Sequence, residues 1–334
     1  MPLDLIVPDL LPAAAAPEGM RTLRLPWVER WLARADAQRL AHRGLHSWLA
    51  RAFGLPDPPP VAAVTLAGEG ALPEGNWLRA DPVHLRVGQD AVALHDASIL
   101  DVTPEEAAQL VSALQSLFAP DGLEFIAPAP SRWYVRVPAG EVPVTTPLAE
   151  ALGRNVFGLL PKGTGRINWP AAITEAQMVM SAHPVNVSRE VAGRPAINSV
   201  WFWGEGATPA HLQSAYAFVH ADDAFARGLA KLAGVHTLPT PRGFAQVDAV
   251  RGDEWVLVVD DSLSRALHKN GDEGWMRAAQ ELDELWFAGM DEAVHRFDGV
   301  RIVLPGPRDT LVSTISARAR WRWLRTRKPL AAHA

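Results

Sequence analysis

Apolar runs that do not alternate with polar residues constrain the fold of this chain most strongly. Trp255–Val259 is such a run, and Leu3–Leu11 and Val300–Leu304 are further strands expected near the two ends of the chain. A strand that is apolar on both faces must be covered on both faces, which is typical of parallel sheets flanked by helices. Segments with helical spacing lie between these runs, at Pro26–Arg43, His46–Phe53, Ala221–Ala233 and Gly274–Arg296. This alternation predicts an α/β fold with a mostly parallel sheet.

The middle of the chain has a different pattern of expected strands and helices. Trp77–Val87 alternates like a strand, and Ala91–Asp96 follows a Gly88–Asp90 turn, which predicts a hairpin. Thr103 before Pro104 and two glutamates indicates the start of a helix that runs to Phe118. Further strands are expected at Leu123–Phe125, Trp133–Val137 and Asn198–Trp203, and further helices at Thr146–Leu152 and Ala171–Ala182. This segment is therefore predicted to be a smaller α+β domain.

The domain organisation follows from these two patterns of expected elements. We expect a discontinuous α/β core at 1–75 and 200–316, an inserted α+β domain at 76–199, and a basic tail at 317–334. Leu55–Pro60 is rich in proline and is the first candidate boundary. Ala62–Leu66 is expected to be a short strand.

Composition excludes several classes of function. The formal net charge of −5 argues against general nucleic-acid binding. The absence of cysteine excludes disulfides and thiolate ligands. The amino-terminal stretch has no basic leader, and no run reaches the roughly 18 apolar residues of a membrane span. We therefore expect a cytoplasmic protein without a transmembrane segment.

The tail carries a concentration of positive charge. Ala317–Lys328 reads ARARWRWLRTRK. A basic segment with two tryptophans can contact an acidic partner or a membrane surface. The alternative is a solvated terminus whose tryptophans pack on the body of the protein.

Arg79, Asp81 and His84 form the first polar cluster, on one expected strand. Arginine binds phosphate and carboxylate groups through two parallel hydrogen bonds, which suits an anion site. The alternative is an internal pair between Arg79 and Asp81 that fixes the end of the strand.

A second cluster follows the break at His183-Pro184. Asn186, Arg189 and Asn198 lie close behind it and can form a polar pocket wall. Pro184 disfavours helical geometry at His183, so the preceding helix is expected to end there. The alternative is that Asn186 caps a helix and the arginines are exposed.

Asp260 and Asp261 form a third cluster, directly after a buried strand. Ligand sites of doubly wound sheets lie beyond the carboxyl ends of the strands, and paired aspartates there can hold a metal. The alternative is that both residues cap the next helix. Walker A, GxGxxG, GxSxG and HExxH patterns are absent from the chain.

The segment His183–Gly206 (HPVNVSREVAGRPAINSVWFWGEG) resembles the archaeal-type cofactor-independent phosphoglycerate mutases of the alkaline phosphatase superfamily. Arg79–Val137 is similar to the inserted domain of that family, and Thr146-Pro147-Leu148 occupies the place of its Asp-Pro-His. The length and layout also resemble a proteobacterial group of regulatory, phosphoglycerate mutase-like proteins (RpfE). The resemblance implies an alkaline phosphatase-like sheet with an inserted domain.

The same resemblance implies two divalent metals (Mn, Zn or Mg) and a serine that carries phosphate. Asp9 matches the first metal-binding aspartate, and His268 is kept in a stretch where Ser264 replaces an aspartate. Ser47 is present but offset from the place of the nucleophile, where Leu45 stands. The family's late Asp-His pair falls at Pro305-Gly306, which has no metal-binding side chain. Asp9, Asp260, Asp261 and His268 are therefore the candidate metal ligands, and Ser47 is the candidate nucleophile.

Three functions stay open at this point. The first is a mutase-like protein with a degenerate metal site, no cofactor and a regulatory role, which binds a small phosphorylated or carboxylated metabolite. Its contacts would come from Arg79, Asp81, His84, His183, Asn186, Arg189 and Asn198. The second is an active metal-dependent mutase, and the third is a scaffold that acts through the basic tail. The sequence leaves the oligomeric state open.

Overall fold

The computed structural model describes residues 2–12, 16–87, 92–95, 99–247, 255–322 and 324–333. The chain divides into two compact units. Unit 1 comprises residues 1–57 and 211–334, and unit 2 comprises residues 58–210.

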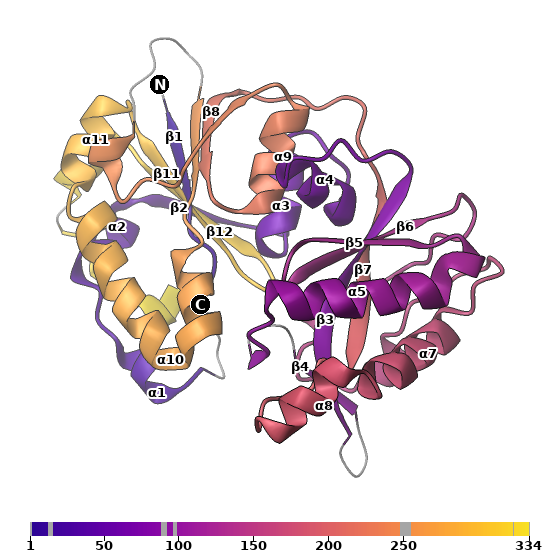
Figure 1. Cartoon of the computed structure of the whole chain (residues 1–334). Helices are drawn as coiled ribbons and strands as arrows, with labels where there is room; N and C mark the ends of the chain where they lie inside the picture. Colours follow the sequence, from indigo (N-terminus) through magenta and orange to yellow (C-terminus); the bar gives the residue numbers. More distant parts are fainter. Residues whose placement is uncertain are drawn as a thin grey trace. The chain divides into compact units, whose positions relative to one another are not determined.

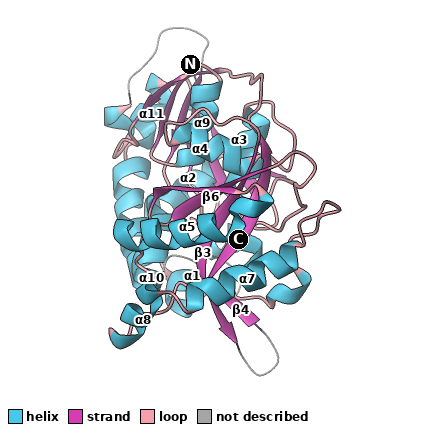
Figure 2. Ribbon diagram, turned by 45° about the vertical axis from the view of Figure 1, so that its right-hand side comes forward, coloured by secondary structure: helices cyan, strands magenta, loops and turns pink. Residues whose placement is uncertain are grey.

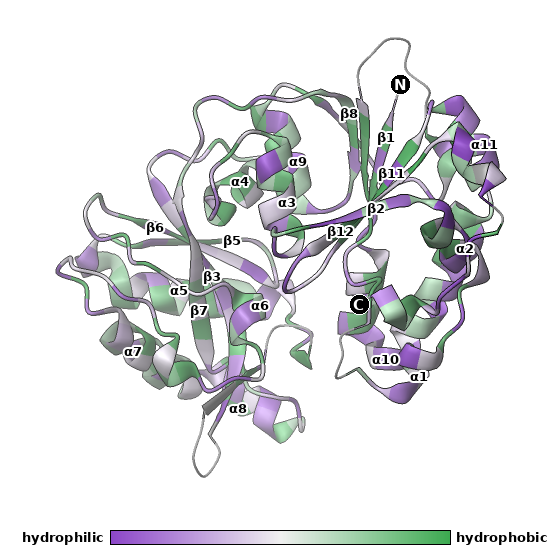
Figure 3. Ribbon diagram, turned by 180° about the vertical axis from the view of Figure 1, so that it is seen from behind, coloured by the Kyte–Doolittle hydropathy of each residue, from purple (hydrophilic) through white to green (hydrophobic). Residues whose placement is uncertain are grey.

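Unit 1 is built on a seven-stranded sheet in the order β2-β12-β11-β1-β10-β8-β9. Five neighbouring strands run parallel: β11, β1, β10, β8 and β9. At one edge, β12 is antiparallel to β11, and β2 is antiparallel to β12. The strands are β1 (Leu3–Ile6), β2 (Asp36–Leu40), β8 (Tyr216–Ala221), β9 (His236–Leu238), β10 (Trp255–Val259), β11 (Val300–Pro305) and β12 (Thr310–Ile315). The predicted α/β fold with a mostly parallel sheet is confirmed, and Figure 3 shows β8 and β11 as mostly hydrophobic.

Helices cover both faces of this sheet (Figure 1). One face carries α1 (Glu18–Thr22), α2 (Pro26–Arg34), α10 (Ser262–Leu282) and α11 (Met290–Arg296). The other face carries α3 (Gly44–Ala52) and α9 (Ala224–Leu232). Leu3, Leu5 and Val7 of the β1 segment belong to the core under the first group of helices. Asp4 alternates with them and therefore faces the side of α3 and α9.

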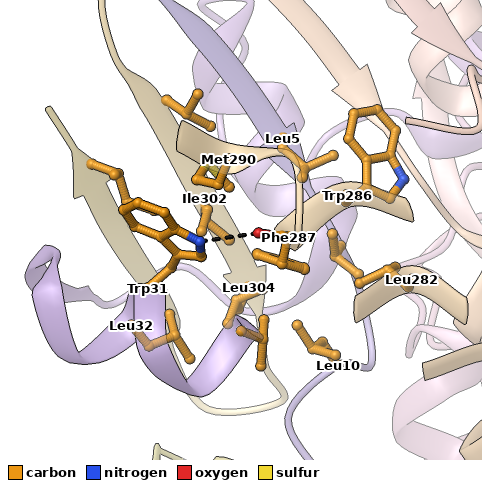
Figure 4. Close-up of a cluster of buried hydrophobic side chains, with 14 of the residues drawn as sticks. Leu5, Leu10, Trp31, Leu32, Leu282, Trp286, Phe287, Met290, Ile302 and Leu304 are labelled. Carbon is orange, nitrogen blue, oxygen red and sulfur yellow. Dashed lines mark hydrogen bonds between the residues drawn. The ribbon is translucent and has the colours of Figure 1, made fainter. Parts of the chain in front are cut away.

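The core of unit 1 contains a π-helical turn, η5 (Asp283–Phe287), between α10 and α11. A π turn leaves some backbone groups without a hydrogen-bond partner inside the helix, and a side chain of α2 bonds to one of these groups. The indole Nε1 of Trp31 donates to the Phe287 carbonyl oxygen at 3.0 Å (Figure 4). Asp283 is buried, and its carboxylate accepts from the backbone N–H of Val28 at 2.7 Å and of Trp27 at 3.2 Å. These bonds hold the amino end of α2 against the core.

Unit 2 is an antiparallel sheet in which β3 lies between β7 on one side and β4 and β6 on the other. Its strands are β3 (Asn76–Val87), β4 (Val92–His95), β5 (Glu124–Ala129), β6 (Arg132–Val137) and β7 (Ser199–Ala207). Its helices are α4 (Val61–Gly68), α5 (Pro104–Phe118), α6 (Leu148–Ala151), α7 (Trp169–Ser181) and α8 (Pro184–Val191), drawn in cyan in Figure 2. The predicted start of α5 at Thr103 is confirmed, and the structure adds a capping box: Thr103 accepts from Glu106 N at 3.2 Å, and Glu106 accepts from Thr103 N at 2.9 Å.

The unit boundaries lie at 57/58 and 210/211, whereas the sequence suggested 75/76 and 199/200. β7 belongs with unit 2 because it pairs with β3 along most of its length. The expected strand at Ala62–Leu66 is wrong, because these residues form α4. All eight residues of α4 are buried, and a short run that is apolar all round has no period that separates a strand from a helix.

Two predicted helices also have different bounds. The helix expected over Pro26–Arg43 ends at Arg34, and β2 follows as an exposed edge strand that pairs with β12. The helix expected over Gly274–Arg296 corresponds to the part of α10 that follows a kink at Gly271 (φ 59°, ψ −151°), and it is interrupted by the π turn. The predicted Gly88–Asp90 turn lies outside the described residues. In the described part of the chain, no helix is long and apolar enough to cross a membrane.

Some residues after Ala317 pack on the rest of unit 1. Arg322 donates to the Asp36 carboxylate at 2.6 Å and to the Arg34 carbonyl oxygen at 3.1 Å, and Leu330 is buried. Trp321 is 69% exposed, so its indole is not packed away. Whether this segment contacts an acidic partner or a membrane stays a prediction.

Candidate functional site

The carboxyl edge of the unit 1 sheet is the first place where the predicted site residues occur. Asp9 follows β1 and adopts a left-handed backbone with φ of 59°, a conformation that aspartate tolerates better than most residues. Its carboxylate accepts from the hydroxyl of Ser264 on α10 at 2.5 Å, and its carbonyl oxygen accepts from Trp275 Nε1 at 2.7 Å. Asp9 is therefore fixed to α10 through both its side chain and its backbone.

Asp260 and Asp261 follow β10 at the same edge. Asp260 is buried, and its carboxylate accepts from Trp286 Nε1 at 2.8 Å and from the Ser262 backbone N–H at 3.0 Å. Asp261 occupies the N-cap position of α10 without a capping hydrogen bond from its side chain, and it forms an ion pair with Arg265. Burial raises the pKa of Asp261 to about 6, with Asp223 and Asp260 adding to the shift and Arg265 opposing it. His268 is exposed four residues after Ser264, so it shares that face of α10.

Ser47 lies in the first turn of α3. The amino end of this helix is next to the carboxyl end of β11 in space. The backbone N–H of Gly44 donates to the Gly306 carbonyl oxygen at 2.9 Å. Ser47 is buried, and its hydroxyl donates to the carboxylate of Asp57 at 2.9 Å. A Cβ added to Gly306 would lie 2.9 Å from the Asp309 carbonyl oxygen, so this position has no space for a larger residue.

These residues do not fit a pair of divalent metals. Asp9 and Asp260 each bind neighbouring donors, and Gly306 stands where the resemblance implies ligands. Across the described ranges, no group of three or more His, Asp or Glu side chains is placed to hold a metal ion. A two-metal site needs several such side chains around each ion.

The predicted anion-binding pair of unit 2 is an internal ion pair. Arg79 and Asp81 are both buried, and Arg79 Nε lies 3.0 Å from Asp81 Oδ1. Trp203 Nε1 donates to Asp81 Oδ2 at 2.7 Å, and the Arg79 guanidinium lies over the Tyr134 ring at 5.1 Å. Burial raises the pKa of the Asp81 carboxyl, while Arg79 and Trp203 oppose the shift. This geometry matches the alternative in which Arg79 and Asp81 fix the strand.

His84 and Asn198 connect β3 to the segment before β7. The side chain of Asn198 bonds the backbone of Leu85 twice, accepting from its N–H at 2.7 Å and donating to its carbonyl oxygen at 2.9 Å. His84 Nδ1 lies 2.8 Å from the Ala196 carbonyl oxygen. Both side chains therefore extend the sheet contacts of their strands.

His183, Asn186 and Arg189 hold α8 in place. His183 caps α8 by accepting from Val185 N at 3.3 Å. Asn186 is buried and bonds both the N–H (2.7 Å) and the carbonyl oxygen (2.9 Å) of Ile197. Arg189 is 1% exposed and donates to Glu106 at 2.7 Å and to the Pro195 carbonyl oxygen at 2.7 Å. The stretch that carries the family resemblance thus supplies internal contacts of unit 2.

A cavity of about 340 Å³ lies at the opposite, amino edge of the unit 1 sheet. Its walls include Trp48 and Arg51 on α3, Tyr216 at the start of β8, Trp255 at the start of β10 and Arg301 near the start of β11. The Arg301 guanidinium lies 4.4 Å from the centre of the Trp255 ring and 6.0 Å from that of Trp48.

Asp4, beneath this cavity, is fully buried in the middle of the sheet. Arg301 Nε donates to Asp4 Oδ1 at 2.7 Å, and the Tyr216 hydroxyl donates to Asp4 Oδ2 at 2.7 Å. Burial raises the pKa of Asp4, and the two donors oppose the shift. Sequence reasoning missed these residues. The signal was a charged residue inside each of two buried strands, Asp4 in LDLI and Arg301 in VRIVLP.

Comparisons with known proteins agree with the family resemblance. The chain is 22% identical over 244 residues to a probable 2,3-bisphosphoglycerate-independent phosphoglycerate mutase of Geobacter sulfurreducens, covering 67% of this chain and 61% of that protein. It is 24% identical over 233 residues to a 2,3-bisphosphoglycerate-independent phosphoglycerate mutase of Methanosarcina acetivorans, covering 63% and 58%. The matched part thus spans about three fifths of these relatives. No established family description matched the chain.

One solved structure shares the fold. The PH0037 protein of Pyrococcus horikoshii aligns with a TM-score of 0.52 at 13% identity, over 94% of this chain and 87% of that one. A cofactor-independent phosphoglycerate mutase of Thermoplasma acidophilum aligns with a TM-score of 0.43 at 15% identity, over 94% and 89%. The sequence matches to the Geobacter and Methanosarcina proteins, at 22% and 24% identity, agree with the phosphoglycerate mutase-like relationship that the resemblance implied.

Proposed function

We propose that this chain is a divergent phosphoglycerate mutase-like protein that binds a small anionic metabolite in a regulatory role and does not transfer phosphate through two metals. One observation carries the proposal: the carboxylates after β1 and β10 bind side chains and backbone of unit 1, not one another. Arg51 and Arg301, in contrast, border a cavity of ligand size.

The candidate nucleophile supports the same proposal. Ser47 is buried against Asp57, which leaves its hydroxyl poorly placed to attack a phosphoryl group that arrives from solvent. The residues first considered for metabolite contacts, from Arg79 to Asn198, all have partners inside unit 2. We therefore place anion binding in unit 1.

An active mutase is the second candidate, favoured by the mutase names of the relatives and by the aspartates at the carboxyl edge. A coupled assay with 3-phosphoglycerate, with and without Mn²⁺, separates the two candidates. We expect no turnover above a protein-free blank and no tightly bound metal by elemental analysis. Two metal ions per chain together with turnover that disappears in Asp9→Asn would establish the mutase instead.

Ligand binding is tested separately by thermal unfolding. A ligand that binds only the folded state raises the melting temperature, and the rise grows with the logarithm of its concentration above the dissociation constant. We expect at least one small carboxylate or phosphate ester to raise the melting temperature of the wild type and not of Arg51→Ala. A panel that leaves the wild type unchanged would remove the binding proposal.

A further inference from the structure

The cavity at the amino edge of unit 1 has walls of definite chemistry. Trp48 and Trp255 contribute indole rings, and Ala52 adds a small apolar side chain. Trp48, Arg51 and Ala52 are three and four residues apart on α3, so they present one helix face to the cavity. The volume of about 340 Å³ lies at the lower end of the range for sites that enclose small molecules.

The floor of the cavity is rigid and electrically balanced. Arg301 is held by Asp4 through two hydrogen bonds, one from Nε at 2.7 Å and one from Nη2 at 2.5 Å. Tyr216 donates to the same carboxylate. The charges of Asp4 and Arg301 cancel, while the guanidinium face still stacks on Trp255. Asp4 therefore fixes the flat guanidinium group of Arg301 in the cavity floor, and the pair adds no net charge.

The rim of the cavity carries the remaining charge. Arg51 is exposed, and it forms no ion pair with the described residues. Arg51, Arg301 and the Asp4 carboxylate beneath them together have a net charge of one positive unit. Trp48 adds a buried indole N–H that has no hydrogen-bond partner within the described ranges. One cation beside aromatic walls matches a ligand with one negative charge and a flat apolar body.

We infer that this cavity binds an aromatic monocarboxylate, with its ring against the wall that Trp255, Ala52 and the Arg301 guanidinium form and its carboxylate at Arg51. The inference rests on the proposed binding function and names its ligand class. A phosphorylated three-carbon acid carries two or three negative charges and almost no apolar surface. It would gain little from the indole walls and would meet one uncompensated cation among the described lining residues.

Calorimetric titration with 2-naphthoate tests the inference directly, with 2-naphthamide as the uncharged analogue of the same shape. We expect saturable binding of 2-naphthoate at one site and binding of the amide that is about tenfold weaker. Arg51→Ala is expected to weaken 2-naphthoate by about the same factor and to leave the amide unchanged. Arg227→Ala, an exposed arginine on α9, is the matched control and should bind both compounds like the wild type.

A substitution that fills the cavity tests the inference a second time without a change of charge. Ala52→Met fills the space beside Trp255, and we expect it to abolish binding of 2-naphthoate while the thermal transition stays near that of the wild type. Equal affinity for the acid and the amide, or unchanged binding in Ala52→Met, would overturn the inference. Tighter, Arg51-dependent binding of 3-phosphoglycerate would overturn the ligand class and leave the proposed binding function standing. Turnover of 3-phosphoglycerate with Mn²⁺ would instead remove the proposed function.

Discussion

Arg301 on β11 and Asp4 on β1 form an ion pair in the interior of the central sheet, with Arg301 Nε 2.7 Å from Asp4 Oδ1. The two strands are direct neighbours, and Asp4 is opposite Arg301 in their parallel register. A carboxylate that is fully buried needs such a partner, because an uncompensated charge in the interior strongly destabilises the fold.

Removal of one partner of this pair should therefore be costly. We expect Arg301→Met to lower the free energy of unfolding by about 3–5 kcal/mol, because Asp4 stays buried with only Tyr216 as a donor. The double variant Asp4→Leu/Arg301→Met should recover most of that loss. Urea unfolding at pH 7 measures both values. A single variant as stable as the wild type would mean that water already solvates Asp4.

Asp261 predicts a pH dependence of stability. Its pKa in the folded state is about 6, against an ordinary value of 3.8, so the folded state binds the proton more tightly than the unfolded state. Stability from this group is therefore greatest below pH 4 and falls as the pH rises to 6. Asp261→Asn lacks the ionised form and should be more stable than the wild type above pH 6, by about 1–3 kcal/mol.

The measurement for Asp261 is a series of urea unfolding curves between pH 4 and pH 8. The advantage of Asp261→Asn should shrink toward zero at pH 4. Asp272→Asn makes the same charge change at an exposed position of α10 and should show no comparable dependence. An advantage of Asp261→Asn that is constant with pH would contradict the assignment.

Arg189 should act on the stability of unit 2 and not on metabolite binding. Arg189→Met removes a buried cation with partners on three segments, and we expect a loss of about 3–5 kcal/mol. Arg194→Met also removes a contact to Glu106, at a more exposed site, and should cost less than about 1 kcal/mol. Amide hydrogen exchange of α5 and α8 reports the difference. Loss of ligand affinity without loss of protection would restore Arg189 as a binding residue.

Ser47 should behave as a packing residue. Ser47→Ala removes one hydrogen bond to Asp57 and is expected to lower the free energy of unfolding by about 1 kcal/mol. Comparison with Asp57→Ala and the double variant gives the coupling energy between the two side chains. Mass spectrometry after incubation with 3-phosphoglycerate and Mn²⁺ should find no phosphate on Ser47. A phosphorylated Ser47 would show that it is a nucleophile after all.

Local signals in the sequence predicted the elements that depend on neighbouring residues. Thr103, Pro104 and Glu106 are close in sequence, so their capping box is visible without a structure. Trp255–Val259 was recognisable as a buried strand because it is apolar on both faces. β2 was not recognisable, because an exposed edge strand has no apolar alternation and forms only through its pairing with β12.

The candidate sites show the same division. The resemblance identified Arg79, Asn186 and Arg189 as important positions, but residue type alone does not separate a ligand contact from an internal one. That difference depends on burial and on partners that are distant in sequence. Asp4 and Arg301 are almost the whole chain apart, and only the register of β1 against β11 brings them together.

The sequence by itself determined the α/β class, the parallel central strands and the relationship to phosphoglycerate mutases, because these depend on residue patterns that occur within short segments. The tertiary structure decided which polar groups are already bonded and where a cavity remains. Hydrogen-bonding partners and enclosed volume are properties of several strands and helices packed together, and in this protein that packing commits Asp9 and Asp260 to internal contacts and leaves Arg51 beside the cavity.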